Sequence, residues 1–397
     1  AVGGNAGLSV TTGVQNTLIG GLAGDALTDA DANVAIGIGA LGSDTLGSLS
    51  VAVGANALNA QNFTTATNTY NVAVGHFAGV TVTTGVENTL IGGLAGDALT
   101  VGVRNVAVGK GALTTDVGGN KSVAIGHSAL EAQNLGATTT DSFNTAVGYN
   151  AGSAVTTGIQ NTFVGGSAGD ATNDGAENVA VGYAALSANC GNGNGAFGYA
   201  ALFQCTGQFN TAVGTSAGSA VTSGGNNLFL GKDTGLSGSP GGAQTTASNV
   251  IFLGDENITN IYAAVSSIGT SDERDKTDFT ALDLGLDFVK NLKPVTYYWD
   301  KRSKYGDKYA EGYDLNAQTP DGTHKEDWLD IGFKAQEVVA LEEAAGYTIS
   351  DKTNLVSNLT ADGTQYGLKY DRFVPILVKA IQEQNALITA LTDRITA

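Results

Sequence analysis

The chain has 397 residues and a formal net charge of -18, with 57 Gly, 4 Pro and 2 Cys. Residues 1–248 hold only 4 Lys/Arg and 13 Asp/Glu, whereas residues 249–397 hold 15 and 24, so two physically different regions meet near residue 250. Because both regions are acidic and no apolar run approaches the ~20 residues of a membrane span, we expect neither nucleic-acid binding nor membrane insertion. The chain opens in mid-repeat without Met, so we expect it to be part of a longer protein.

A repeat of 16 or 17 residues runs through the first region, with insertions after Gly54, Gly126 and Gly231. In most repeats Asn stands four residues before a fixed glycine, an apolar residue stands directly before it, and Ala stands three residues after it. The fixed glycines, called register glycines below, are Gly3, Gly20, Gly37, Gly54, Gly75, Gly92, Gly109, Gly126, Gly148, Gly165, Gly182, Gly198, Gly214, Gly231 and Gly254.

A longer period lies over the short one. GVQNTLIGGLAGDALT (13–28) returns as GVENTLIGGLAGDALT (85–100), and the residue after the fixed Ala runs Gly, Gly, Leu, Leu and then repeats. The larger unit therefore contains four repeats, and duplication of a four-coil block is its simplest source.

Each repeat favours a short strand and a tight turn. The pattern N-[TV]-[AL]-[VI]-G predicts a strand whose Val or Ile points inward, followed by a glycine turn, while the small Ala lets successive layers approach. Stacked Asn side chains are expected to form an amide ladder. Since the segments are short and broken by Gly, a helix is excluded, and the region 1–254 is predicted to be a parallel β-solenoid about 70 Å long.

The predicted strands are apolar on both faces, because Ala or Leu stands opposite Val or Ile. A single solenoid would expose one of these faces to water, so we expect a homotrimeric rod in which identical chains cover it. The repeats resemble those of phage tail fibres and of the β-roll heads of trimeric autotransporter adhesins.

Three motifs follow the repeats: SDERDKTDFTALDLGLDFVKNLKPVTYYWD (271–300), IGFKAQEV (331–338) and YDRFVPILVKAIQEQNALITALTDRI (370–395). In this order they resemble the C-terminal intramolecular chaperone domain of phage endosialidases and tail fibres. That resemblance implies a domain that directs trimerisation of a β-rich stalk and then cuts itself off. It also implies that Ser271 is the nucleophile, Lys276 its base and Thr270–Ser271 the cleaved bond.

The residue types suit this chemistry. A serine hydroxyl needs an adjacent base, and a lysine can serve only as the neutral amine, which Arg274 could favour as a neighbouring cation. The reaction would be intramolecular, with one cleavage per chain and no turnover. The alternative is a solvated loop entering a helix with Ser271 as its N-cap.

The domains are expected at 1–254 (solenoid), 255–270 (linker with the cleavage site), 271–369 (chaperone) and 370–397 (helix). The helix carries a heptad seam with one polar layer, which predicts a trimeric coiled coil; an amphipathic helix on its own domain is the alternative. The seam residues are Leu377, Ile381, Gln384, Ile388, Leu391 and Ile395.

Two smaller signals remain. Cys190 and Cys205 follow successive register glycines at similar spacing, so they would stack in adjacent coils as either a disulfide or two buried thiols. His76, His127 and His324 have no spacing suited to a metal, and we expect no cofactor.

The sequence thus predicts a fibre or adhesin on a virion tail or cell surface. It would meet a host-surface glycan or protein, through the insertions 59–69 and 131–142 rather than through the coils. A glycan depolymerase is the main alternative, although the 13 scattered acids offer no evident carboxylate pair. An ice- or mineral-binding solenoid would need a regular Thr array, and Thr stands beside the Asn in only some coils.

Overall fold

The computed structural model describes residues 1–258, 271–308, 310, 312–360 and 362–397. The chain folds as two compact units. Unit 1 contains Ala1–Leu236 and Gln244–Gly254, and unit 2 contains Ser237–Ala243 and Asp255–Ala397.

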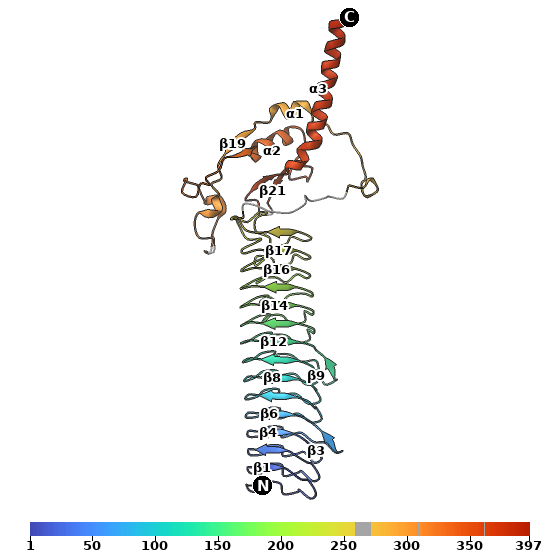
Figure 1. Cartoon of the computed structure of the whole chain (residues 1–397), viewed down its shortest axis with the longest axis vertical. Coiled ribbons are helices and arrows are strands. Elements are labelled where there is room, and N and C mark those ends of the chain that lie inside the picture. Colours follow the sequence, from blue (N-terminus) through green and yellow to red (C-terminus); the bar gives the residue numbers. More distant parts are fainter. Residues whose placement is uncertain (259–270, 309, 311, 361) are drawn as a thin grey trace. The chain divides into compact units, whose positions relative to one another are not determined.

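Unit 1 is a parallel β-solenoid, as predicted, with its coils stacked one on the next (Figure 1). One strand from each coil joins a sheet of 14 parallel strands that follow one another in chain order. The strands of this sheet are β1 (Thr17–Ile19), β2 (Val34–Ile36), β4 (Val51–Val53), β6 (Val72–Val74), β7 (Thr89–Ile91), β8 (Val106–Val108), β10 (Val123–Ile125), β12 (Thr145–Val147), β13 (Thr162–Val164), β14 (Val179–Val181), β15 (Gly195–Phe197), β16 (Thr211–Val213), β17 (Leu228–Leu230) and β18 (Ile251–Leu253).

The inward face of the sheet is not the predicted one. In every strand the middle residue, an Ala, Leu or Phe, is buried, while the first and third residues point outward. In β8, for example, Ala107 is buried and Val106 and Val108 are partly exposed. The prediction that Val and Ile point inward is therefore wrong. Successive residues of a strand point to opposite faces, so the middle Ala, Leu or Phe occupies the interior and its two neighbours face outward.

The register glycines are required by both conformation and space. From Gly3 to Gly214 their φ angles lie between +131° and +144°. A Cβ on Gly109 would lie 2.3 Å from the carbonyl oxygen of Gly126 in the next coil. No other residue fits such a turn between closely stacked layers, which confirms its predicted role.

The four-coil period is explained by side-chain volume. Phe163, the large middle residue of β13, lies against Gly152 and Gly169, so that a Cβ on Gly169 would be 2.6 Å from its ring. In two of every four coils the middle residue is Ala and the same turn position carries a buried Leu, as in Ala180 and Leu186. A third coil also has a middle Ala but carries Gly there, and the large strand residue of the next coil fills the space, as Phe163 does beside Gly152. Each part of the interior therefore receives one large side chain, which comes from either a strand or a turn.

The Asn ladder exists, but its bonds run mainly from side chain to backbone. Asn105 Oδ1 accepts the backbone N–H of Ser122 in the next coil at 2.9 Å, and its Nδ2 donates to the carbonyl of Gly119 at 2.8 Å. The same pair of bonds recurs on Asn33 and Asn161. The ladder therefore satisfies buried backbone groups coil by coil.

Ser122, which interrupts the Asn pattern, belongs to a buried polar cluster. Gln133 Nε2 donates to Asp116 Oδ2 at 2.6 Å and to Ser122 Oγ at 2.8 Å, and Asn144 Nδ2 donates to Gln133 Oε1. Burial raises the pKa of the Asp116 carboxyl group above its ordinary value. The equivalent cluster one super-repeat earlier is formed by Asp44, Gln61, Ser50 and Asn71.

The insertions after Gly54 and Gly126 add short parallel pairs outside the main sheet. They bulge from the same side of the solenoid (Figure 1). The pairs are β3 (Gly47–Ser48) with β5 (Thr67–Asn68) and β9 (Gly119–Asn120) with β11 (Thr140–Asp141).

Unit 2 is a small α+β fold that ends in a long helix. Its core contains Leu284, Phe288, Val338, Val356, Phe373 and Ile376. Its elements are η1 (Glu273–Asp275), α1 (Leu286–Asn291), β19 (Val295–Tyr297), η2 (Arg302–Lys304), η3 (Leu315–Ala317), β20 (Asp330–Gly332), α2 (Ala335–Ala344), β21 (Ser357–Leu359), β22 (Tyr366–Leu368), η4 (Tyr370–Arg372) and α3 (Phe373–Thr396). The strands form two antiparallel pairs, β19–β20 and β21–β22.

Candidate functional site

Ser271 and Lys276 are in direct contact. The Lys276 Nζ atom lies 2.6 Å from the Ser271 Oγ atom and 3.2 Å from the Ser271 carbonyl oxygen. The short helix η1 reverses the chain between them, so that the lysine returns to the serine five residues later. This is the nucleophile–base contact that serine activation requires. Thr270, on the other side of the predicted cleavage point, lies outside the described residues.

The neighbouring charges are arranged differently from the expectation. The Arg274 Nη2 atom lies 2.6 Å from Asp272 Oδ2, and this partner lowers the pKa of the Asp272 carboxyl group. Asp272 also caps η1 by accepting the Arg274 backbone N–H, so Ser271 is not the N-cap. Arg274 is thus engaged by Asp272, and the structure does not support its use as the cation beside Lys276.

The Ser271–Lys276 pair is open to water. Both side chains are exposed in the single chain. A lysine accepts a proton only as the neutral amine, a form that water-free surroundings favour. The structure places the two groups in contact, but it does not shield Lys276 from water. Other groups would have to exclude water from the lysine.

Two glutamates join segments of unit 2 that lie far apart in the sequence. Glu342 of α2 is buried, and its carboxylate accepts the backbone N–H groups of Leu355, Val356 and Ser357 at 2.7 to 2.9 Å. Glu383 of α3 accepts the backbone N–H of Leu286 at 2.7 Å, at the first turn of α1. This bond is the largest cause that lowers the pKa of Glu383. Sequence patterns did not identify either residue, because their partners lie 13 to 97 positions away.

The predicted seam of α3 faces solvent in the single chain. Phe373, Ile376 and Ala380 are buried on one side of the helix. The seam positions Leu377, Ile381, Gln384, Ile388, Leu391 and Ile395 are all exposed. The C-terminal half of α3 projects away from α1 and α2 (Figure 1). An unpartnered apolar row of this kind is suited to pairing with other helices, and the coiled coil stays a prediction.

The outer face of the solenoid sheet is apolar along its whole length. The 14 strands contribute two outward residues each, and of these 28 positions 22 are Val, Ile, Leu or Phe, five are Thr and one is Gly. No charged side chain stands at any of these positions, all of which lie in the described residues. We call this surface the outer sheet face. Contiguous apolar surfaces of this extent are typical of protein interfaces.

Cys190 and Cys205 are buried free thiols in adjacent coils, so the structure favours the second of the two alternatives. Burial raises the pKa of the Cys190 thiol to about 11 and also raises the pKa of Cys205. Thr172 Oγ1 lies 3.3 Å from Cys190 Sγ, and Asn210 Nδ2 lies 3.4 Å from Cys205 Sγ. High pKa values make both thiols poor nucleophiles, so neither is a candidate for catalysis.

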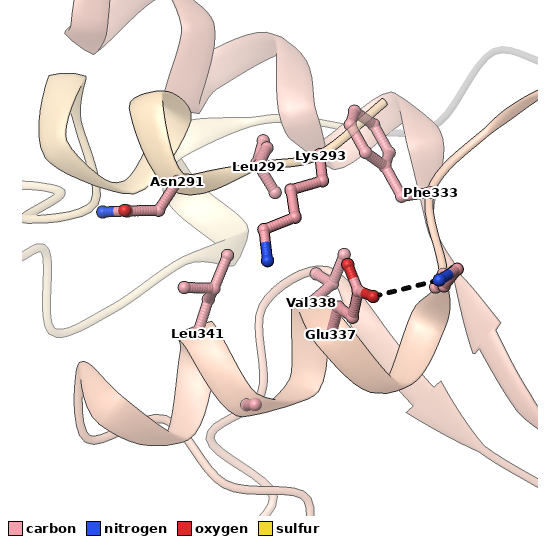
Figure 2. A pocket seen from close by; sticks show the side chains of 9 residues that line it. Asn291, Leu292, Lys293, Phe333, Glu337, Val338 and Leu341 are labelled. Carbon is pink, nitrogen blue, oxygen red and sulfur yellow. Dashed lines mark hydrogen bonds and ion pairs between the residues drawn. The ribbon is translucent and has the colours of Figure 1, made fainter. Parts of the chain in front are cut away.

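A cavity of about 240 Å³ lies between the C-terminal end of α1 and α2. Leu292 and Lys293 after α1 face Val338 and Leu341 of α2 across it, and the Lys334–Glu337 ion pair lies at its edge (Figure 2). Neither Ser271 nor Lys276 lines this cavity.

The described residues contain no group of three or more His, Cys, Asp or Glu that could hold a metal ion. None of the helices in the same part of the chain is long and apolar enough to cross a membrane.

The motif that opens at Ser271 also identifies the family of this region. Residues 271–347 match the family described as chaperone of endosialidase. The match covers the first two of the three motifs and ends before α3. Such chaperone domains act in trimeric proteins. No curated protein and no solved structure is detectably similar to the chain.

Proposed function

We propose that this chain forms a homotrimeric fibre of a phage tail or of a bacterial surface appendage, and that the fibre contacts a host cell surface. Its C-terminal chaperone domain drives trimerisation and cuts the chain before Ser271. The protein would accordingly be located in the virion tail or at the cell surface.

The outer sheet face carries this proposal. Its aliphatic side chains remain partly exposed on every coil, although the solenoid interior is already filled. Burying apolar surface contributes roughly 25 cal/mol per Å², so three such faces packed together would stabilise an assembly strongly. Threefold symmetry lets the same face serve every chain. The exposed seam of α3 offers a second contact of the same symmetry.

The Ser271–Lys276 contact supports self-cleavage. Ser271 Oγ would attack the carbonyl carbon of residue 270 while Lys276 takes its proton. The peptide C–N bond would break as an ester forms, and the proton would pass to the new amino group of Ser271. Water would then hydrolyse the ester and leave a carboxylate at Thr270. Because the nucleophile adjoins the bond it attacks, proximity supplies much of the rate.

We propose that host contact is made by the insertions at 59–69 and 131–142 rather than by the repetitive coils. Thr64, Thr65 and Ala66 are exposed at the tip of the first, whereas Gln61 and Thr69 at its ends are buried in the solenoid. The ends therefore support the fold, and only the tips are available to a receptor. Deleting both tips should abolish host attachment and leave the oligomer intact.

Substitution of one outward strand residue tests the trimer. Val164→Asp places a charge on the outer sheet face, where burial without a partner costs several kcal/mol per chain. We expect trimers to be lost in sedimentation experiments. Gln160→Asp is the matched control, since this exposed residue lies in the same coil outside the outer sheet face. Trimers that persist in Val164→Asp would remove the outer sheet face from the proposed interface.

A further inference from the structure

Part of unit 2 precedes the proposed cleavage point in the sequence. The loop Ser237–Ala243, which belongs to the insertion after Gly231, packs as part of unit 2, and we call it the glycine loop. Glu256, which follows the last solenoid strand, also belongs to unit 2. Cleavage before Ser271 would therefore divide unit 2 between an N-terminal product, which ends at residue 270, and a C-terminal product, which begins at Ser271.

The glycine loop contacts two segments of the C-terminal product. The backbone N–H of Ala243 donates to Asp362 Oδ2 at 2.9 Å. A Cβ on Gly242 would lie 2.6 Å from Asp362 Oδ1, and a Cβ on Gly238 would lie 2.5 Å from the Cβ of the buried Ser303. The loop backbone therefore lies directly against the C-terminal product, and glycine is required at both positions.

Glu256 makes a second contact that crosses the proposed cleavage point. Lys308 Nζ donates to Glu256 Oε1 at 2.8 Å, and the two side chains are only 14% and 6% exposed. Lys301 Nζ donates to the backbone carbonyl of Glu256, also at 2.8 Å. Removing one partner of a buried, hydrogen-bonded charge pair mainly speeds dissociation, so this contact can set the lifetime of a complex.

The receiving surface is held together within the C-terminal product. Arg302 Nη2 donates to the backbone carbonyl of Thr364 at 2.6 Å, which joins the two segments that contact the glycine loop. Asp362 Oδ1 accepts the Thr360 hydroxyl at 2.6 Å and the Thr364 N–H at 3.1 Å, so its carboxylate is fixed in orientation. A preorganised surface loses less conformational entropy when it binds.

We infer that the C-terminal product stays bound to the N-terminal product after cleavage, through the glycine loop and Glu256. The resemblance to self-cleaving chaperones implies a domain that cuts itself off, but the contacts described above do not depend on the peptide bond that is broken. In the proposed trimer three copies of the contact would act together and slow release further. This inference rests on the proposed cleavage before Ser271.

The test compares two full-length chains. One is the parent, and the other is Ser271→Ala with the recognition sequence of an added site-specific protease inserted between residues 270 and 271. Denaturing mass spectrometry measures cutting, and size-exclusion chromatography of the same samples shows whether the two products elute together. We expect the products to elute together in both chains. Products of the protease-cut chain that separate during the column run would overturn the inference.

The engineered cut keeps the two proposals apart. A parent that stays intact while the protease-cut products elute together would refute self-cleavage and leave the inference standing. A parent that cuts itself and whose products separate would refute the inference and leave self-cleavage standing.

Variants on both sides of the cut test the contacts, with release timed at one low urea concentration. Lys308→Gln and Gly242→Asn should each speed release at least about tenfold, and Asp362→Asn severalfold. Asn tolerates the positive φ of Gly242 (+72°), so its main effect is the added side chain against Asp362. The double variant Glu256→Gln/Lys308→Gln should release no faster than the faster of its single variants, because both lose the same contact.

Matched controls lie away from these contacts. Asp287 and Lys290 form an exposed ion pair wholly within the C-terminal product, and Gly136 has a φ of +83° with open space around its Cβ position. Asp287→Asn, Lys290→Gln and Gly136→Asn should change the release rate less than twofold. The inference is overturned if these controls speed release as much as Lys308→Gln, or if neither Lys308→Gln nor Gly242→Asn speeds it.

The Tm and oligomeric mass of each chain are measured before cutting. A variant that is unfolded when uncut is set aside, and the decision then rests on the variant across the cut and on Asp362→Asn.

Discussion

Unit 1 and unit 2 bury their apolar side chains in different ways. The solenoid interior is a continuous column of small and medium side chains, most of them fully inaccessible, from Leu18 to Phe252. In the described part of unit 2 the core cluster has six buried members, while Trp299, Trp328 and Ile331 are exposed. Neighbouring coils complete one another's interior, so the fold of the solenoid is stabilised from coil to coil. The described part of unit 2 leaves a larger fraction of its large apolar side chains exposed in the single chain.

Removal of the candidate nucleophile should have the largest effect, because it is all or none. We expect Ser271→Ala to give one intact species by denaturing mass spectrometry, and Lys276→Ala to do the same. Ser350→Ala and Lys290→Ala change exposed residues of unit 2 and should cleave as the parent does. If parent and Ser271→Ala chains are both intact, unit 2 does not cleave the chain, and it differs from the solenoid in fold alone.

A cavity in the solenoid should lower the free energy of unfolding, and a second substitution beside it should restore part of the loss. Phe163→Ala removes a buried ring that fills the space beside Gly152 and Gly169, and should cost about 3–5 kcal/mol in urea unfolding. Gly169→Leu added to it reproduces the Ala–Leu arrangement seen at Ala180 and Leu186, so we expect a gain of at least ~1 kcal/mol over the single variant. A double variant no more stable than Phe163→Ala would contradict the volume rule and weaken the contrast with unit 2.

A smaller, pH-dependent effect is expected where α3 meets α1. The Leu286 N–H holds the pKa of Glu383 below its ordinary value of 4.5. A carboxyl group with a lowered pKa stabilises the fold above its unfolded pKa, and that stabilisation is lost as the pH falls through the folded value. Glu383→Gln should therefore lower Tm at pH 7, and the difference from the parent should shrink as the pH falls through the lowered pKa of Glu383. Glu343→Gln changes an exposed residue of α2 and should show no such trend. If both variants lose the same Tm at every pH, the bond between Glu383 and the Leu286 N–H does not stabilise the fold.

The two regions were also unequally predictable from sequence. The solenoid, its coil boundaries and the Ala packing follow from a local repeat that leaves one arrangement open. The inward face was assigned wrongly at residues such as Val108, because both faces of each strand are apolar and the local pattern does not say which face turns inward. The Asp116–Gln133 cluster could have been found, since both residues recur one super-repeat apart as Asp44 and Gln61.

In unit 2 the resemblance of the motif that opens at Ser271 indicated the Ser271–Lys276 pair, and the two side chains are in contact. The links that hold the unit together could not be predicted, because Glu342 and Glu383 reach backbone groups far along the chain. Isolated hydrogen bonds over such separations leave no periodic pattern in the sequence.

The mass of the uncut particle tests the central claim most directly. In sedimentation equilibrium, full-length Ser271→Ala protein should behave as a single species of three times the 39.9 kDa chain mass. A stable, soluble particle of one chain mass would show that the outer sheet face needs no partner, and would contradict the account of a trimeric fibre.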